Sequence, residues 1–215
     1  MRLRLGHPRR ALVVAPHPDD EVIGAFGLIR TLRRLGTRVD VLIVTDGGAS
    51  HPESRRWPRA KLTARRRRES RFALRALGLS AGHVKHLDLP DGGLPQVQVK
   101  LDGLMAREVY RRRGLDLIVG PAGDDDHADH RAVAAALARA RTGAKRVEYP
   151  VWPAGSAAAF PLRLPVSGGG GAKRWAVRAY RSQLGGISDD PSGFALSYSQ
   201  VAAFTRGVER FRAPR

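Results

Sequence analysis

The sequence ALVVAPHPDDE at residues 11–21 decides how the rest of the chain is arranged. Its apolar first half predicts a short buried strand, and Pro16 and Pro18 predict the turn that ends it. From Val22 onward the apolar residues recur at helical spacing. Between strand and helix the chain places a histidine and three carboxylates: His17, Asp19, Asp20 and Glu21.

This turn has two interpretations. In one, Asp19 caps the helix, and Asp20 and Glu21 complement the positive end of its dipole. In the other, His17 and Asp20 bind a metal ion and Asp19 acts as a base. The sequence of the turn alone does not distinguish these two interpretations. The rest of the chain has to decide between them.

The composition predicts one soluble domain spanning residues 1–215. The chain is 42% hydrophobic and 27% charged, and its length suits one α/β core. No apolar run approaches the roughly 18 residues of a membrane span, and no signal peptide is recognisable, so we expect a cytoplasmic protein. Without cysteine, any transition metal must be held by histidine and carboxylate.

The chain is strongly basic, with a formal net charge of +18. Such a field favours anionic substrates, anionic membrane surfaces or nucleic acid. It can equally reflect an arginine-rich composition, because the basic residues are scattered over several predicted helices. Aromatic residues make up only 6% of the chain, which argues against stacking on single strands. We therefore expect no specific nucleic-acid partner.

Strands and helices alternate along the predicted core, residues 11–152. The predicted strands are 11–16, 39–45, 84–89, 115–120 and 147–152. The predicted helices are 21–35, 59–77, 97–114 and an alanine-rich segment that ends near 141. Beyond the core we expect a mobile Gly/Pro loop at 153–172 and two helices, 173–183 and 197–212.

This alternation predicts a Rossmann-like, doubly wound parallel sheet with helices on both faces and strand order 3-2-1-4-5. Ligands bind such sheets beyond the carboxyl ends of the strands, where the strand order reverses. That point lies between strands 1 and 4. The fourth strand runs into the sequence GDDDHADH at 123–130, so the topology should bring it beside His17.

The two stretches together favour a metal site. His17, Asp20 and His130 form a two-histidine, one-carboxylate set typical of a catalytic zinc ion, although iron, cobalt or manganese would also be accepted. Asp19 would act as general base. His127 would stabilise the oxyanion and protonate the leaving amine, and Asp129 would orient the His127 imidazole.

These groups predict metal-assisted hydrolysis of an amide or ester. Serine hydrolysis is the rival reaction, but the chain has no Gly-x-Ser-x-Gly elbow. No glycine-rich phosphate-binding fingerprint follows the first strand either, which argues against a dinucleotide enzyme.

The helix at 59–77 carries charge on the stripe that should face the sheet. Arg66 and Glu69 lie on that stripe, whereas most of the run at 65–68 lies off it. Charged side chains on an inward face must either form an ion pair or serve a function such as substrate binding. Arg66 therefore either faces a substrate or forms a structural pair with Glu69.

The sequence resembles the PIG-L/LmbE-like zinc N-deacetylases. The matching motifs are PHPDDE at 16–21 and HADH at 127–130, with weaker matches at 45–47, 66–69, 89–92 and 180–183. The resemblance covers about residues 11–183. It implies the same zinc ligands and base, substrate contacts from Arg66 and Asp91, and removal of an acyl group from an N-acylated amino sugar or its conjugate.

Two positions depart from the family pattern. Ala128 replaces a usual proline, and Asp125 stands where some sugar-specific members have tyrosine, so the exact substrate is not carried over. A different amide, in a thiol-sugar conjugate or an antibiotic, is one alternative. A non-catalytic basic module that binds nucleic acid or anionic lipid is the other.

Overall fold

The computed structural model describes residues 1–155 and 158–214. A five-stranded parallel sheet forms its centre, in the order β3-β2-β1-β4-β5. Its strands are β1 (Arg10–Ala15), β2 (Arg38–Thr45), β3 (Val84–Leu89), β4 (Leu117–Pro121) and β5 (Lys145–Tyr149). The predicted fold class and strand order are confirmed.

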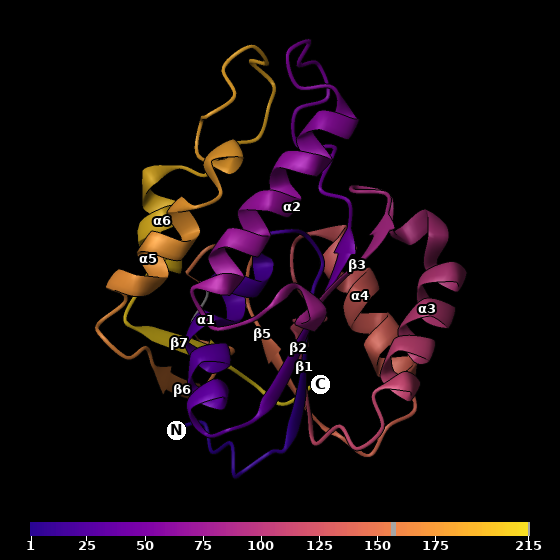
Figure 1. Cartoon of the computed structure of the whole chain (residues 1–215), viewed down its shortest axis with the longest axis vertical. Helices are drawn as coiled ribbons and strands as arrows, with labels where there is room; N and C mark the ends of the chain where they lie inside the picture. The colour runs from indigo at the N-terminus through magenta and orange to yellow at the C-terminus, as the bar shows by residue number, and fades with distance from the viewer. Residues whose placement is uncertain (156–157, 215) are drawn as a thin grey trace.

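Helices cover both faces of this sheet (Figure 1). One face carries α1 (Asp20–Arg34), α2 (Arg59–Arg75), α5 (Gly171–Arg178) and α6 (Tyr198–Phe204). The other carries α3 (Gln98–Arg111) and α4 (Ala128–Arg139). Three short 3₁₀ helices lie at Ala81–His83, Pro95–Val97 and Arg181–Gln183. None of the helices in the described part of the chain has the length and apolar character needed to cross a bilayer.

Two hydrophobic cores fill the space between the sheet and its helices. In β1, Val13 belongs to the core beneath α1, whereas Leu12 and Val14 belong to the core beneath α3 and α4. All three are fully buried, as expected for a strand whose side chains alternate between two covered faces. This arrangement leaves the carboxyl edge of the sheet as the place where polar groups collect.

The C-terminal part differs from the prediction. The predicted loop at 153–172 contains β6 (Leu162–Pro165), and the predicted helix at 197–212 ends at Phe204 and is followed by β7 (Val208–Phe211). These two strands pair antiparallel. Gly207 interrupts the helical pattern, and the residues after it alternate between half-buried and buried, which is the period of a strand. Residues 156–157 of the loop lie outside the described part, and its mobility stays a prediction.

A buried ion pair between α5 and β7 binds the backbone of α1. Helix α1 is kinked at Ala25 (φ −140°, ψ 18°), which frees backbone groups on both sides of the kink. The Glu209 carboxylate accepts the N–H groups of Gly27 and Leu28 at 2.8 and 3.0 Å. Lys173 Nζ donates to the Ile23 carbonyl at 2.6 Å and to Glu209 at 2.8 Å. The C-terminal segment thus stabilises the helix that opens the site.

Candidate metal centre and active site

A cleft of about 610 Å³ lies at the carboxyl edge of the sheet. Six of the eight residues predicted for the site line it: His17, Asp19, Asp20, Arg66, Asp91 and His127. The other two, Asp129 and His130, belong to the first turn of α4 and are fully buried. The topology therefore brings the two histidine-rich stretches together, as the strand order predicts.

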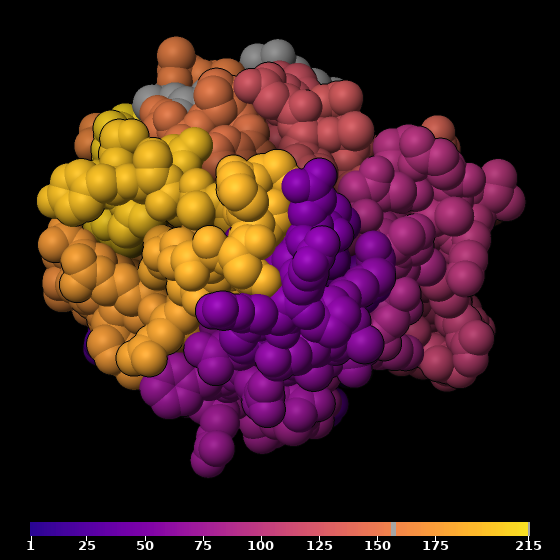
Figure 2. Space-filling view, turned by 90° about the horizontal axis from the view of Figure 1, so that it is seen from above, coloured from indigo at the N-terminus to yellow at the C-terminus, as the bar shows by residue number. Residues whose placement is uncertain are grey.

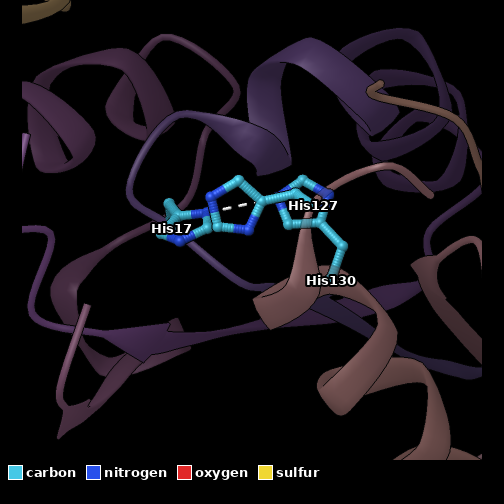
Figure 3. A group of neighbouring side chains, drawn as sticks. All are labelled: His17, His127 and His130. Carbon is cyan, nitrogen blue, oxygen red and sulfur yellow. Dashed lines mark hydrogen bonds between the residues drawn. The ribbon is translucent and has the colours of Figure 1, made fainter. Parts of the chain in front are cut away.

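Three side-chain atoms converge on one point beside the cleft. His17 Nδ1, Asp20 Oδ2 and His130 Nε2 form a triangle in which every edge measures 3.2 Å. Zinc bonds of about 2.0–2.1 Å in tetrahedral geometry separate neighbouring ligand atoms by about 3.3 Å. The triangle thus has the dimensions of one face of such a site. Figure 3 shows the rings of His17 and His130, with His127 beside them.

The charges of this triangle also suit a cation. The pKa of Asp20 lies far below its usual range: burial opposes ionisation, but the charge and hydrogen bond of His130 outweigh it. Burial likewise disfavours a charged His130, yet the charge of Asp20 and the hydrogen bond with Asp125 raise the pKa of His130 to about 9. Asp20 is therefore anionic and draws positive charge toward both rings. Because metal ligands must be deprotonated, a divalent cation can take the place of those protons.

Two carboxylates face the other nitrogen of the His17 ring. Asp129 Oδ2 and Asp91 Oδ1 each lie 3.2 Å from His17 Nε2. These three residues could themselves surround a cation. However, Asp129 already accepts the N–H groups of Gly92 and Leu94 at 2.8 and 3.0 Å. We therefore interpret Asp91 and Asp129 as the groups that orient the His17 ring, and the triangle as the candidate site for the ion.

The position of Asp129 corrects one detail of the prediction. Its carboxylate faces His17 and the 92–94 loop instead of the His127 ring. Asp129 does contact that ring, but through its backbone N–H, which donates to His127 Nδ1 at 3.2 Å. Because Nδ1 accepts this bond, the neutral ring carries its proton on Nε2.

Asp19 has a strained backbone beside the triangle. Its φ of 135° and ψ of −29° lie in a region that non-glycine residues rarely adopt. Its N–H donates to Glu21 Oε2 at 2.9 Å. Burial raises the pKa of Asp19 to about 7, although the Arg66 charge opposes the rise. The side chain is thus poised to exchange a proton near neutral pH.

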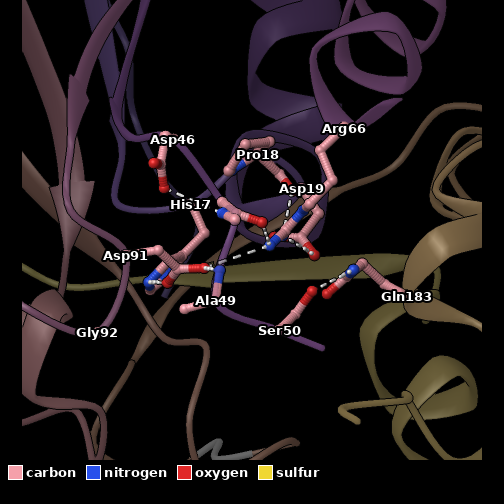
Figure 4. Close-up of polar contacts among 12 residues, drawn as sticks. His17, Pro18, Asp19, Asp46, Ala49, Ser50, Arg66, Asp91, Gly92 and Gln183 are labelled. Atoms are coloured by element: carbon pink, nitrogen blue, oxygen red, sulfur yellow. Dashed lines mark hydrogen bonds and ion pairs between the residues drawn. The ribbon is translucent and has the colours of Figure 1, made fainter. Parts of the chain in front are cut away.

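Arg66 fixes this strained turn. Its guanidinium donates to the carbonyls of Pro18 and Gly47 at 2.7 and 3.0 Å, and to Asp19 Oδ2 at 3.1 Å (Figure 4). A Cβ on Gly47 would lie 2.8 Å from the Pro18 ring, so only glycine fits there. Of the two roles predicted for Arg66, the pair with Glu69 is wrong, because Glu69 bonds instead to Arg65 and Ser182.

Glu21 supports the same turn from below. The side chain is fully buried and accepts hydrogen bonds from the Tyr180 hydroxyl and from Ser70, the latter at 2.9 Å. Burial raises the pKa of Glu21, while these donors oppose the rise. Glu21 thus links α1, α2 and the C-terminal segment behind the candidate base, a larger role than complementing the helix dipole.

The comparisons with known proteins agree with this geometry. The family profile "PIG-L: GlcNAc-PI de-N-acetylase" matches residues 12–141. The chain belongs to this family. The predicted resemblance is confirmed.

Relatives of this PIG-L chain include two with named activities. It is 28% identical to the 2'-N-acetylparomamine deacetylase of Streptomyces fradiae over 78% of its own length and 60% of that protein. It is 31% identical to the diacetylchitobiose deacetylase of Thermococcus kodakarensis over 57% of its own length and 45% of that protein. It therefore spans less than two thirds of either relative.

A solved structure shares the fold of this PIG-L chain. The N,N'-diacetylchitobiose deacetylase of Pyrococcus horikoshii superposes with a TM-score of 0.68 at 21% identity, over 95% of this chain and 83% of the other.

Sequence reasoning missed several residues of the site. Asp125 is buried and accepts the N–H of His127 at 3.0 Å and that of Trp152 at 2.9 Å, so it joins the loop before α4 to the segment that follows β5. The sequence marks Asp125 by its place in the acidic run at 124–126 and by its departure from the tyrosine of some family members, but neither feature predicts these hydrogen bonds. The cleft also has an apolar wall, which includes Trp152, Phe194 and Leu196.

Two segments that are distant in the sequence meet over the cleft. Phe194 N–H donates to the Ser50 carbonyl at 2.7 Å, and Gln183 donates to the Ser50 hydroxyl at 3.2 Å. Figure 2, seen from above, shows the C-terminal segment lying against the segment that follows β2. No sequence periodicity announces this contact, which completes the wall.

Proposed function

We propose that this protein is a zinc-dependent N-deacetylase that acts on an N-acylated amino sugar or its conjugate. The observation that carries the proposal is the triangle of His17 Nδ1, Asp20 Oδ2 and His130 Nε2, with Asp19 at its side in a cleft. The named activities of the relatives, deacetylation of paromamine and chitobiose derivatives, support the substrate class.

His17, Asp20 and His130 would hold the ion. The chemistry that bound zinc supplies is Lewis-acid polarisation of a carbonyl and a lower pKa for water. Asp91 and Asp129 would keep the His17 ring in place by accepting from its Nε2–H. The remaining steps belong to the side chains of the cleft.

Asp19 would take a proton from the attacking water and return it to the leaving nitrogen. Its raised pKa, about 7, suits a group that must both accept and release a proton at neutral pH. His127 lines the cleft, and its Nε2–H takes no part in the hydrogen bond between Nδ1 and the Asp129 N–H. The Nε2–H would therefore donate to the carbonyl oxygen of the amide, which becomes negatively charged during the reaction. Burial, followed by the charges of His17 and His130, lowers the pKa of His127. A neutral donor is therefore favoured over the predicted acid that protonates the amine.

Arg66 and Asp91 are the proposed contacts to the substrate at the cleft floor. Both line the cleft, and their charged groups lie 3.9 Å apart. Arg66 is only 3% exposed and already has three acceptors. Asp91 also has partners, the Ala49 N–H at 2.9 Å and the His17 ring at 3.2 Å, but it is less buried than Arg66 and is the more accessible of the two.

The test combines metal analysis with a screen of N-acetyl amino sugars for amine release. We expect about one zinc per chain, and hydrolysis that is lost on chelation and restored by zinc. Asp19→Asn should keep the metal and lower the rate by about 10²- to 10⁴-fold. Full hydrolysis by metal-free protein would contradict the proposal. If the folded, zinc-loaded protein releases no amine from any of these sugars, the alternative substrates, an amide in a thiol-sugar conjugate or an antibiotic, would be favoured.

A further inference from the structure

A second hollow lies outside the cleft, between α2 and α5. It measures about 580 Å³. Basic and aromatic side chains dominate its lining: Arg65, Arg68, Phe72, Trp175, Arg178 and Arg181. We call these six residues the basic groove. In Figure 1 the two helices lie side by side on one face of the sheet.

The aromatic residues of the groove are exposed as a pair. Phe72 is 56% exposed and Trp175 is 49% exposed, and their ring centroids lie 5.1 Å apart. Single exposed apolar side chains are ordinary, but two large rings in contact form a patch that water solvates poorly. The patch therefore has the character of a surface that becomes covered.

Three of the four arginines of the groove lack the carboxylate partner that Arg65 has in Glu69. On the same helix, Arg59 and Arg67 pair with Asp46 and Asp88. Within the described residues, neither an ion pair nor a side-chain hydrogen bond is seen for Arg68, Arg178 and Arg181. The one carboxylate lining the groove, Glu69, is buried and bonded to Arg65 and Ser182. The groove thus presents uncompensated positive charge around the two rings.

The same surface continues to the edge of the active site. A hollow of about 260 Å³ on the other side of α5 shares Arg178 with the basic groove and includes Tyr198, which is 87% exposed. Leu196 lines both this hollow and the catalytic cleft. Leu196 is itself buried, at 8% exposed, so this amphipathic surface with its three exposed aromatic rings ends at the wall that it shares with the cleft.

We propose that this surface docks the protein on a lipid bilayer that carries anionic headgroups. Arginine contacts lipid phosphates, and tryptophan, tyrosine and phenylalanine settle at the level of the headgroups. A nucleic-acid duplex matches the charge but offers nothing to the paired rings on the helix surface. The proposal is independent of the catalytic one, because it uses none of the residues assigned to the cleft chemistry.

Cosedimentation with vesicles tests the docking. The full chain should bind phosphatidylcholine vesicles only when phosphatidylglycerol is added, and salt should weaken the binding. Arg68→Gln and Arg178→Gln should each lower the partition coefficient about fivefold. Phe72→Ser with Trp175→Ser should abolish binding at moderate salt. Soluble glycerol phosphate should not compete, which separates a bilayer from a free phosphate site.

The matched control lies on the opposite face of the molecule. Tyr110, on α3, is 72% exposed, and Arg113, just beyond the end of this helix, lies 6.0 Å from its ring centre. Tyr110→Ser with Arg113→Gln should leave vesicle binding unchanged. Groove variants that still hydrolyse a soluble substrate, or keep the wild-type Tm, show that the fold is intact.

Three results would overturn the proposal. One is no binding to phosphatidylglycerol vesicles at low salt. Another is equal loss in the Tyr110 control, which would indicate diffuse charge attraction. The third is duplex DNA binding that the groove variants abolish while vesicle binding persists, which would make the groove a nucleic-acid surface.

Discussion

The Oδ2 atom of Asp129 lies 3.2 Å from Nε2 of His17, on the side of the ring that faces away from Asp20 and His130. A carboxylate in this position fixes the ring orientation of a metal-binding histidine and raises its basicity. The same carboxylate holds Gly92 and Leu94. Asp129 would therefore act on the proposed metal site through His17.

Asp129→Asn should weaken zinc binding by about 10- to 100-fold, because an amide is a poorer acceptor for the His17 ring. Competition with a chromogenic chelator measures the affinity. Asp126→Asn is the matched control. It makes the same change in the loop just before α4, but Asp126 is exposed, and the zinc affinity of this variant should equal that of the wild type. Unchanged zinc affinity in the Asp129 variant would show that the carboxylate only holds the 92–94 loop.

Arg66→Lys should lower kcat on the order of 10²-fold with little change in KM. Lysine keeps the charge, but it cannot reach the Pro18 carbonyl, the Gly47 carbonyl and Asp19 at once, so the candidate base would lose its position. Steady-state kinetics on an N-acetyl amino sugar measures both constants. Arg65→Lys, one position away and bonded to Glu69, should behave like wild type. A raised KM at unchanged kcat would instead make Arg66 a substrate contact alone.

The sequence predicted that the two motifs would lie together, because they follow strands whose adjacency the topology determines. His17 and His130 are far apart in the chain, yet β1 and β4 are neighbours in the sheet. Helical periodicity likewise placed Arg66 and Glu69 on the inward stripe of α2, where both are buried. These features depend on patterns that the local sequence carries.

The hydrogen-bond partners of the buried carboxylates could not be predicted from the sequence. Asp129 shares the first turn of α4 with His130, but whether its carboxylate faces His127 or His17 depends on where the 92–94 loop packs. The same holds for Glu21, whose donor Tyr180 comes from the other end of the chain. The predicted helix at 197–212 is too long for a local reason, because Gly207 follows α6 and the residues after it alternate between half-buried and buried.

Protonation of His86 should make stability depend on pH. The ring lies in β3, and its two nitrogens have no hydrogen-bond partner among the described residues. Burial, followed by the charges of Arg67 and Arg71, lowers the pKa of His86 from 6.5 to about 4, although Asp88 opposes this. Between these values the unfolded chain binds the proton and the folded chain does not, so the stabilising contribution is complete above about pH 6.5 and is lost as the pH falls.

We expect the free energy of unfolding to fall by about 1–2 kcal/mol from this group between pH 6.5 and 4, less than the full shift would give because the ring is only partly buried. Urea unfolding at a series of pH values measures it. His86→Gln should remove this part of the slope, whereas His7→Gln, at an exposed position, should keep it. Parallel slopes for wild type and His86→Gln would contradict the prediction.

The buried pair of Lys173 and Glu209 should be the most sensitive electrostatic contact away from the cleft. The two side chains are 3% and 4% exposed, and Glu209 also accepts two backbone N–H groups at the α1 kink. Lys173→Met leaves that carboxylate buried without its cation, which typically costs about 3–5 kcal/mol. Adding Glu209→Gln removes the orphaned charge while the amide oxygen can still accept from α1.

The double variant should therefore be more stable than Lys173→Met alone, and a double-mutant cycle by urea unfolding measures the coupling. Lys100→Met, which removes an exposed lysine from α3, should change the free energy of unfolding by less than about 0.5 kcal/mol. Strictly additive effects of the two buried substitutions would mean that the kink is held by the backbone bonds of Glu209 and not by the ion pair. Because α1 begins at Asp20, a loosened kink should also displace this member of the metal triangle. Zinc affinity, measured on the same variants, should then be lower than in the wild type.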